Sequence, residues 1–467
     1  MRYLPLILVV ICSFATVHTC PSLCTCISDT ISCNNRGLTI VPSFSSADMS
    51  GVRVLDLSHN NFTSLPVNAF PNSHFETLKL DHNRLRTLPN GTFQGVASDI
   101  KNIDLSNNEL LTLPDALAAL DHLISLNVSN NYRGSSDINL PNNVMRALGD
   151  TLEEFTFGSI KQTDWPRTLN HFQNLHRLEI TSLHPNLIIL PPTGFHGFET
   201  TLVELSIHDT NLLTVPIGIS KLRNLLTLNY DNNRNTGDSG ILLQSFPTSS
   251  NSKLSTLSLK GDSLTIFPLV LKYLQKLTKF SIDNNPLDFL SETSVEGLHT
   301  LRELTIRNCS LERIPAALAT IAALGSIDFS FNAIETVEKR DLQGFTNIQK
   351  LTLSNMPLKY ISRDSLAPLH SLQVLELNNT ALTEVPLAIN FTDNLKNVSI
   401  GHNRIDCMCE NMVWLFHKAV ECNPTGVHGF QVIGECDTIH ATVEEYLTNF
   451  VQRCPGYKEI CNIMPYG

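Results

Sequence analysis

Apolar residues recur along this chain in a fixed short pattern, Leu-x-x-Leu-x-Leu-x-x-Asn-x-Leu-x-x-Leu-Pro. It occurs at Val52–Pro66, Leu123–Asn131, Leu301–Pro315 and Leu372–Pro386, among other places. In its centre, as in Leu55-Asp56-Leu57, apolar and polar residues alternate with the period of a β-strand. The pattern therefore predicts many short strands with one apolar face, each followed by a turn in which proline is tolerated.

The asparagine of the pattern gives the period of the repeat. Most successive slots are 23 to 25 residues apart, and three intervals are longer, at 27 or 29 residues. With a degenerate first repeat around Ile31–Pro42, we count about sixteen repeats, and a fixed period of this kind indicates a stacked solenoid. The slot is occupied by Asn60, Asn83, Asn108, Asn131, Ile160, Leu183, Thr210, Asn233, Asp262, Asn285, Cys309, Asn332, Met356, Thr380 and Asn403.

Each part of the repeat has a physical reason. Successive strands are expected to stack in parallel, about 4.8 Å apart, into one curved sheet. An asparagine buried where the chain leaves the strand can bond the free backbone groups of neighbouring turns, which makes a ladder. The proline-containing segment then turns the chain back along the convex side.

This repeat resembles that of the extracellular leucine-rich repeat proteins. The resemblance implies an α/β solenoid of horseshoe shape, with a parallel concave sheet and a disulfide cap at each end. Departures lie in the middle, where Ile160 and Leu183 replace the asparagine and where Arg133–Asn143 and Arg234–Ser250 are insertions rich in Gly, Ser and Asn. The insertions are either loop decoration or loops that project over a rim and contact a ligand.

Ten of the twelve cysteines lie in two terminal clusters. At the N-terminus, the spacing of Cys20, Cys24, Cys26 and Cys33 is similar to that of the family's N-terminal cap. The resemblance implies the pairs Cys20–Cys26 and Cys24–Cys33, whereas spacing alone allows three connectivities.

The C-terminal cluster begins with Cys407-Met408-Cys409 and resembles the family's C-terminal cap. The resemblance implies the pairs Cys407–Cys436 and Cys409–Cys454. Cys422 and Cys461 remain, and we expect them to form a pair. Cys309 stands alone in an asparagine slot, where we expect a buried free thiol; an intermolecular disulfide is the alternative, and it requires exposure.

The domain boundaries follow from these features. Residues 1–19 read as a signal peptide, since a short charged start precedes an apolar run that is shorter than the about 20 residues of a membrane span. Residues 20–50 form the N-terminal cap with the first degenerate repeat, 51–403 the repeats, 404–461 the C-terminal cap and 462–467 a tail. Paired cysteines and the leader favour a secreted, extracellular protein without membrane insertion.

The formal net charge of −11 disfavours some classes of binding partner. Nucleic acid is not expected as a partner, because phosphate binding needs clustered Lys and Arg. An anionic membrane surface is disfavoured for the same reason.

Motifs for chemistry are weak. Gly237-Asp238-Ser239-Gly240 resembles the serine protease nucleophile motif, but it lacks the following Gly and lies inside an insertion. Asp231, Asn233 and Asn235 begin like an EF-hand loop, yet Leu242 stands where the bidentate Glu is required. His417 near Cys407 and Cys409 lacks the usual zinc spacing, and the histidines are scattered through different slots. We expect no enzyme, no cofactor and no metal.

The outward strand positions lie two, four and six residues before the asparagine slot. The row at minus four is polar and contains no aromatic residue, and the flanking rows add an acidic patch with isolated cations in the middle of the chain. Such a patch could steer a basic protein partner, and a solvated face is the alternative. The residues that we expect to contact a ligand are Glu154, Arg177, Glu179, Glu204, Ser206, His208 and Asp231.

Glycosylation sequons restrict where a ligand can bind. The seven sequons are at Asn61, Asn90, Asn127, Asn308, Asn378, Asn390 and Asn397. By register Asn127, Asn378 and Asn397 fall on outward strand positions, so glycans there would cover parts of the concave face. The largest open stretch then lies between Glu154 and Asp328.

The predicted function is extracellular recognition or adhesion through a protein ligand or receptor bound on the concave face and the insertions. The alternatives are a soluble innate-immune factor for microbial glycan or lipid, and a structural protein of the extracellular matrix. Oligomeric state and the identity of the ligand do not follow from the sequence.

Overall fold

The computed structural model of the chain describes residues 20–45, 48–71, 73–248, 252–288, 290, 292–420 and 430–455. The predicted signal peptide, Cys422, Cys461 and the predicted tail lie outside these residues. The chain divides into two compact units, Met1–Lys161 and Gln162–Gly467.

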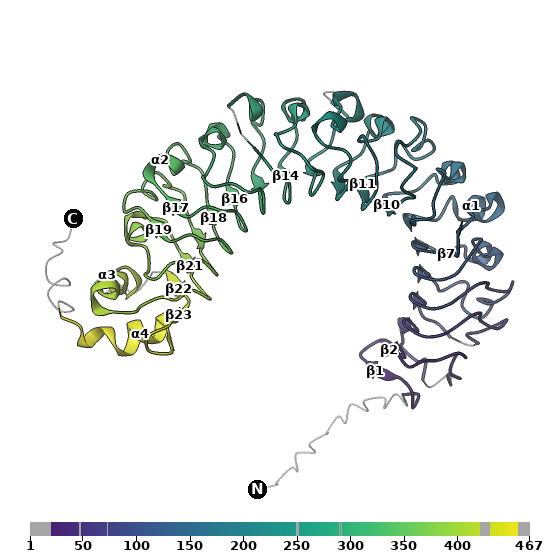
Figure 1. Cartoon of the computed structure of the whole chain (residues 1–467). Coiled ribbons are helices and arrows are strands. Elements are labelled where there is room, and N and C mark those ends of the chain that lie inside the picture. Colours follow the sequence, from purple (N-terminus) through teal and green to yellow (C-terminus); the bar gives the residue numbers. More distant parts are fainter. Residues whose placement is uncertain are drawn as a thin grey trace, which may run out of the picture. The chain divides into compact units, whose positions relative to one another are not determined.

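In the first unit, six strands pair in parallel and one hairpin strand starts the sheet (Figure 1). Leu55 lies beside Ile31 on one side and Leu78 on the other, and all three side chains are buried. The strands are β1 (Thr25–Ile27), β2 (Thr30–Ser32), β3 (Val54–Asp56), β4 (Thr77–Lys79), β5 (Asn102–Asp104), β6 (Ser125–Asn127) and β9 (Glu154–Phe157). β1 and β2 pair antiparallel, and β2 to β6 and β9 follow in parallel. The same unit contains the 3-10 helix η1 (Asp115–Ala119), the two-stranded hairpin of β7 (Tyr132–Arg133) and β8 (Ser136–Asp137), and helix α1 (Asn142–Leu148).

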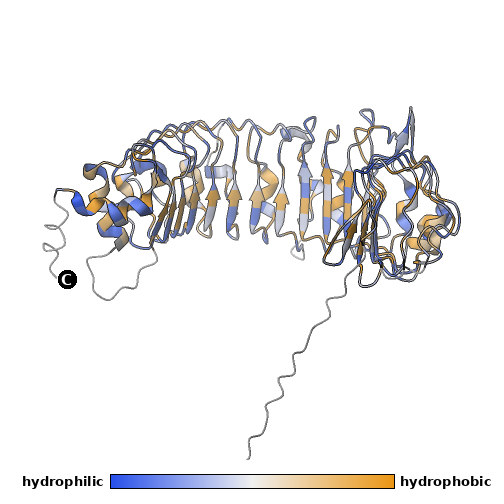
Figure 2. Ribbon diagram, turned by 90° about the horizontal axis from the view of Figure 1, so that it is seen from below, coloured by the Kyte–Doolittle hydropathy of each residue, from blue (hydrophilic) through white to orange (hydrophobic). Residues whose placement is uncertain are grey.

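In the second unit, the strands line the inner side of an arc and the 3-10 helices lie on its outer side (Figure 1). Figure 2 shows its strands side by side and pointing in one direction. They are β10 (Arg177–Thr181), β11 (Glu204–His208), β12 (Thr227–Asp231), β13 (Thr256–Ser258), β14 (Lys279–Ser281), β15 (Glu303–Thr305), β16 (Ser326–Asp328), β18 (Lys350–Thr352), β20 (Val374–Glu376), β21 (Asn397–Ser399) and β22 (Gln431–Ile433). Two pairs are separate, β17 (Thr336–Val337) with β19 (Tyr360–Ile361), and β23 (Glu435–Cys436) with β24 (Ala441–Thr442).

Proline starts most of the outer segments. A proline precedes η1, η2 (Arg167–His171), η3 (Ile217–Lys221), η6 (Leu269–Tyr273), η8 (Ala316–Thr320) and η9 (Leu387–Phe391). Proline suits this place because its φ is fixed near the helical value. Its missing N–H costs nothing here, since these prolines lie outside the paired strands. The remaining helices are η4 (Asp238–Gly240), η5 (Leu243–Ser245), η7 (Glu292–Ser294), η10 (Val451–Arg453), α2 (Lys339–Leu342), α3 (Cys409–Val420) and α4 (Val443–Asn449).

The asparagine ladder forms as expected. Asn83 is buried, its Nδ2 donates to the carbonyls of Leu57 at 3.1 Å and Leu80 at 3.0 Å, and its Oδ1 accepts from the Phe62 N–H at 3.1 Å. The same bonds recur at Asn108 and Asn285. Each asparagine thus satisfies backbone groups of two successive repeats, which fixes the stacking.

One ladder slot departs from the expected burial. Leu183 is buried in place of asparagine, but Ile160 is 49% exposed and therefore does not occupy the ladder interior. β9 itself keeps the parallel register with β6, and after it the buried Ser159 donates a hydrogen bond to Asp137 of the insertion at 2.7 Å.

Disulfides close both ends of the described chain. The structure contains Cys20–Cys26 and Cys24–Cys33 at the start, and Cys407–Cys436 and Cys409–Cys454 at the end. These are the four pairs that the resemblance implies. Cys422–Cys461 lies outside the described residues.

Candidate binding surface on strands β10 to β12

Three adjacent strands of the second unit are the longest of the described sheet. β10, β11 and β12 have five residues each, whereas no other described strand exceeds four. Their register forms three rows across β10, β11 and β12. The rows are Arg177–Glu204–Thr227, Glu179–Ser206–Asn229 and Thr181–His208–Asp231. We call these nine outward residues the β10–β12 surface. They alternate along each strand with fully buried Leu, Ile and Tyr residues, because successive side chains of a strand point to opposite faces.

His208 lies between two carboxylates on this surface. Its Nε2 is 2.9 Å from Oε1 of Glu179 on the neighbouring strand, and its Nδ1 is 2.8 Å from Oδ2 of Asp209. The hydrogen bond to Glu179, helped by Asp209 and opposed by burial, raises the pKa of His208 from 6.5 to about 9. The imidazole is therefore a cation at neutral pH, and both of its N–H groups donate to carboxylates.

The other polar side chains of this surface also form ion pairs or hydrogen bonds with neighbouring residues. Arg177 pairs with Glu204 at 3.0 Å across β10 and β11. Asp231 accepts hydrogen bonds from the Ser258 hydroxyl at 2.6 Å and the Lys260 N–H at 2.9 Å. Ser206 accepts from Asn229 at 3.1 Å.

These contacts correct the expected charge pattern. The cations of the patch are not isolated, because Arg177 and His208 each contact a carboxylate. The carboxylates of Glu179, Glu204, Asp209 and Asp231 outnumber these two cations, so the surface keeps an acidic excess on side chains held in defined positions. Glu154 lies on β9, in the first unit.

The two insertions differ. The first forms the β7–β8 hairpin, where Gly134 has no atom within 4 Å of an added Cβ, and it borders a groove of ≈ 600 Å³ that Tyr132, Arg133 and Ile160 help to line. The second packs against the preceding repeat: Phe246 is buried, and the Ser245 hydroxyl donates to the Val215 carbonyl at 2.6 Å. The second insertion is thus part of the outer layer rather than a loop projecting over the rim.

The sequon asparagines all reach the surface. Asn90, Asn308, Asn390 and Asn397 are exposed, and Asn61, Asn127 and Asn378 are partly buried. Asn127 already donates to Asp104 at 3.2 Å, so a glycan there would displace this bond. No sequon falls on β10, β11 or β12.

Two ladder slots hold groups that ionise. Cys309 is a free, fully buried thiol whose pKa burial raises to about 11, and this geometry leaves no access for an intermolecular disulfide. Asp262 is fully buried as well, and burial raises its pKa from 3.8 to about 8. Its Oδ1 accepts from the Asn233 N–H at 2.8 Å, while its Oδ2 has no hydrogen-bond partner among the described residues. Asp262 is therefore protonated at neutral pH.

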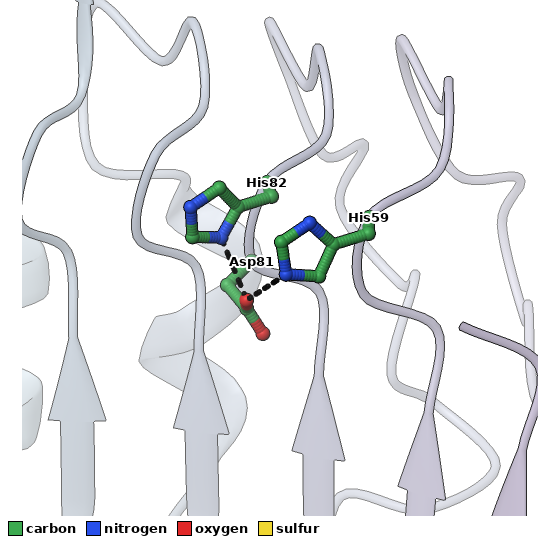
Figure 3. Close-up of side chains that lie close together, drawn as sticks. All are labelled: His59, Asp81 and His82. Carbon is green, nitrogen blue, oxygen red and sulfur yellow. Dashed lines mark hydrogen bonds and ion pairs between the residues drawn. The ribbon is translucent and has the colours of Figure 1, made fainter. Parts of the chain in front are cut away.

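One cluster corrects the expectation that the histidines occupy different slots. His59 and His82 both stand immediately before a ladder asparagine in consecutive repeats, and the carboxylate of Asp81 lies at the edge of both rings, facing one nitrogen of each (Figure 3). The separation of 23 residues between these histidines, equal to one repeat, was the signal in the sequence.

Family models and relatives agree with this architecture. Models described as leucine-rich repeats match residues 51–73 and 73–132. The leucine-rich repeat-containing G-protein coupled receptor 5A of Xenopus laevis is 43% identical over 98 residues, 20% of this chain and 10% of the receptor. The leucine-rich repeat-containing protein 3 of Danio rerio is 34% identical over 132 residues, 27% of this chain and 48% of that protein. The chain thus spans less than half the length of either relative.

A solved structure shows the same fold. A leucine-rich repeat protein of Leptospira interrogans superposes with a TM-score of 0.53 at 21% identity, over 85% of this chain and 95% of that one. Within the described part of the chain, no helix has the length and apolar character that a bilayer crossing requires. The repeat register, the matches and the paired terminal cysteines identify the chain as a leucine-rich repeat protein with a cysteine-rich cap at each end.

Proposed function

We propose that the chain is an extracellular recognition protein that binds a protein ligand through the β10–β12 surface. The observation that carries this proposal is the surface itself: the three longest described strands lie side by side, carry charges held by cross-strand contacts, and bear no sequon. Side chains that are already ordered lose little entropy on binding, which favours affinity. The four disulfides favour an extracellular location, where such bonds persist.

The chemistry of the surface favours a partner with basic side chains. Asp209 is 55% exposed and Glu179 39% exposed, so both carboxylates can receive a cation although they already contact His208. An acidic excess accelerates the encounter with a basic partner and disfavours an acidic one. The residues predicted from sequence, Arg177, Glu179, Glu204, Ser206, His208 and Asp231, form the contact region in this proposal. Glu154 lies in the first unit and stays a separate prediction from the sequence.

The test begins with a binding screen of the purified chain, multimerised for avidity. The array contains extracellular ectodomains, matrix proteins including collagen, and microbial glycans and lipids. A protein hit supports the proposal. Hits confined to microbial glycans or lipids support an innate-immune factor instead, and collagen alone supports a matrix protein.

A glycan placed on the surface then locates the contact. Ser206→Asn together with His208→Thr creates a sequon on β11, and we expect it to reduce binding of the protein hit at least tenfold. Ser206→Gln together with His208→Thr creates no sequon and controls for both substitutions. Lys221→Asn with Arg223→Thr places a sequon at the exposed end of η3 in the same repeat, on the outer side, and should leave binding unchanged. Equal binding by the β11-glycan and η3-glycan variants would contradict the proposed surface.

A further inference from the structure

His59 and His82 hold equivalent places in consecutive repeats. Each stands one residue before a ladder asparagine, after β3 and β4 respectively, with φ of 54° and 53°. The same backbone conformation recurs at Asn107 and Asn130 in the next two repeats, because asparagine and histidine tolerate the left-handed region better than most residues. Stacking of the repeats therefore brings the two imidazoles together, with ring centroids 4.2 Å apart and planes inclined by 14°.

Asp81 is the departure that gives this pair a carboxylate. The equivalent position holds serine in the neighbouring repeats, Ser58, Ser106 and Ser129. Ser58 donates to Asp56, two residues earlier, at 2.7 Å. Two residues before Asp81 the chain has Lys79 in place of an aspartate. The Oδ2 of Asp81 faces the two rings, 2.9 Å from Nδ1 of His82 and 3.9 Å from Nε2 of His59 (Figure 3).

We propose that His59, Asp81 and His82 bind a divalent transition-metal ion, with Zn²⁺ as the favoured ion. Their three ligand atoms, two imidazole nitrogens and one carboxylate oxygen, lie within 4.8 Å of one another. Zn–N bonds of about 2.0–2.1 Å would place tetrahedral ligand atoms about 3.3 Å apart, so rotation of the side chains by an ångström or so forms the site. Two imidazoles and a carboxylate suit Zn²⁺ rather than Ca²⁺ or Mg²⁺, which prefer oxygen ligands.

The surroundings allow an ion to enter and remain. The histidine side chains are 52% and 48% exposed, whereas that of Asp81 is only 17% exposed. The rings are thus reachable from solvent, and the less exposed carboxylate lies at the base of the site. Three protein ligands leave a fourth position for water or for a group on a partner.

The repeat itself supplies matched substitutions for the test. His59→Asn and His82→Asn install the residue of the next two repeats at that position, and Asp81→Ser installs the residue of the neighbouring repeats. None of these changes should disturb the fold, which thermal unfolding without metal would check. His402→Asn is the control, since His402 has the same backbone conformation, with φ of 57°, but lies outside the cluster.

Zn²⁺ is titrated calorimetrically into the whole chain, free of an affinity tag and with N-glycans removed because Asn61 lies two residues from His59. We expect one equivalent of Zn²⁺ to bind. Each of the three ligand variants should weaken this binding on the order of 100-fold, and His402→Asn should leave it unchanged. Ca²⁺ should not bind at this site. Co²⁺ in place of Zn²⁺ should give a visible absorption spectrum that Asp81→Ser changes.

Three results would overturn the proposal. They are an absence of Zn²⁺ binding by the unaltered chain, an undiminished equivalent in His59→Asn and His82→Asn, and loss of that equivalent in His208→Gln instead. The last result would assign the ion to the cluster around His208. The first two outcomes leave ligand binding by the β10–β12 surface untouched, and the added-glycan variants test that surface separately.

Discussion

In the first unit two histidines share the carboxylate of Asp81, whereas in the second unit one histidine lies between two carboxylates, those of Glu179 and Asp209. Both clusters are built from consecutive repeats, but from different rows. His208 belongs to an outward row of β11, where the neighbouring strand supplies Glu179 at 2.9 Å. His59 and His82 follow their strands, where the row before the ladder asparagine places like beside like.

The difference teaches that the number of carboxylates around an imidazole decides what that imidazole can do. His208 has both ring nitrogens bound, and its side chain is 29% exposed, so it serves as a fixed cation that orders the surface. His59 and His82 have one carboxylate between them and stay about half exposed, which leaves nitrogen atoms for an ion. Asp262 is a contrasting case: this buried carboxyl pairs with no cation among the described residues, and burial raises its pKa to about 8, so it holds a proton at neutral pH.

The largest expected effect is at Asp262. Its folded-state pKa of about 8 exceeds the unfolded value of 3.8, so the folded state holds an extra proton between these values and stability falls as pH rises from about 4 to about 8. Asp262→Asn removes that cost and supplies the Nδ2 donor that the other ladder slots use. We expect it to stabilise the second unit by about 2 kcal/mol at pH 7. Denaturant unfolding at pH 5 and pH 8 measures this, and a gain as large at pH 5 as at pH 8 would contradict it.

A smaller effect is expected at His208. Its pKa of about 9 lies above the unfolded value of 6.5, so its contribution to stability is complete below about pH 6.5 and is lost as pH rises through 9. His208→Gln should cost about 1 kcal/mol at pH 6, discounted for partial exposure, and close to nothing at pH 10. NMR titration of the imidazole measures the pKa directly. Glu179→Gln should lower that pKa more than Asp209→Asn, because the bond to Glu179 is the largest cause of the shift.

The smallest effect is expected for Arg177 and Glu204. This pair is also a cross-strand ion pair of the β10–β12 surface, but its side chains are 52% and 31% exposed. Solvent screens it, so a double-mutant cycle with Arg177→Ala and Glu204→Ala should give a coupling of about 0.5 kcal/mol or less. Added salt should reduce this coupling further. A coupling between Arg177 and Glu204 larger than the coupling between Glu179 and His208 would contradict this ranking of the two ion pairs.

Much of the fold follows from the period of the sequence. Stacked repeats place equal slots side by side, so the buried Leu55, the ladder Asn83 and the outward Glu179 were all assigned by counting. The same count contained the His59–His82 pair, since both occupy one slot. The cap disulfides followed from the resemblance rather than from spacing, which allows several pairings.

Tertiary structure decided what counting could not. Ile160 is exposed although the strand before it keeps the register, and the second insertion packs because Phe246 is buried and Ser245 bonds the Val215 carbonyl of the preceding repeat. The ionic states of His208 and Asp262 depend on carboxylates, backbone groups and burial contributed by other repeats. The sequence by itself determined which residues face the sheet and which face the core, because that depends on a local period. Only the tertiary structure decided which charges meet and which protons they hold, because those depend on distances and desolvation summed over neighbouring repeats.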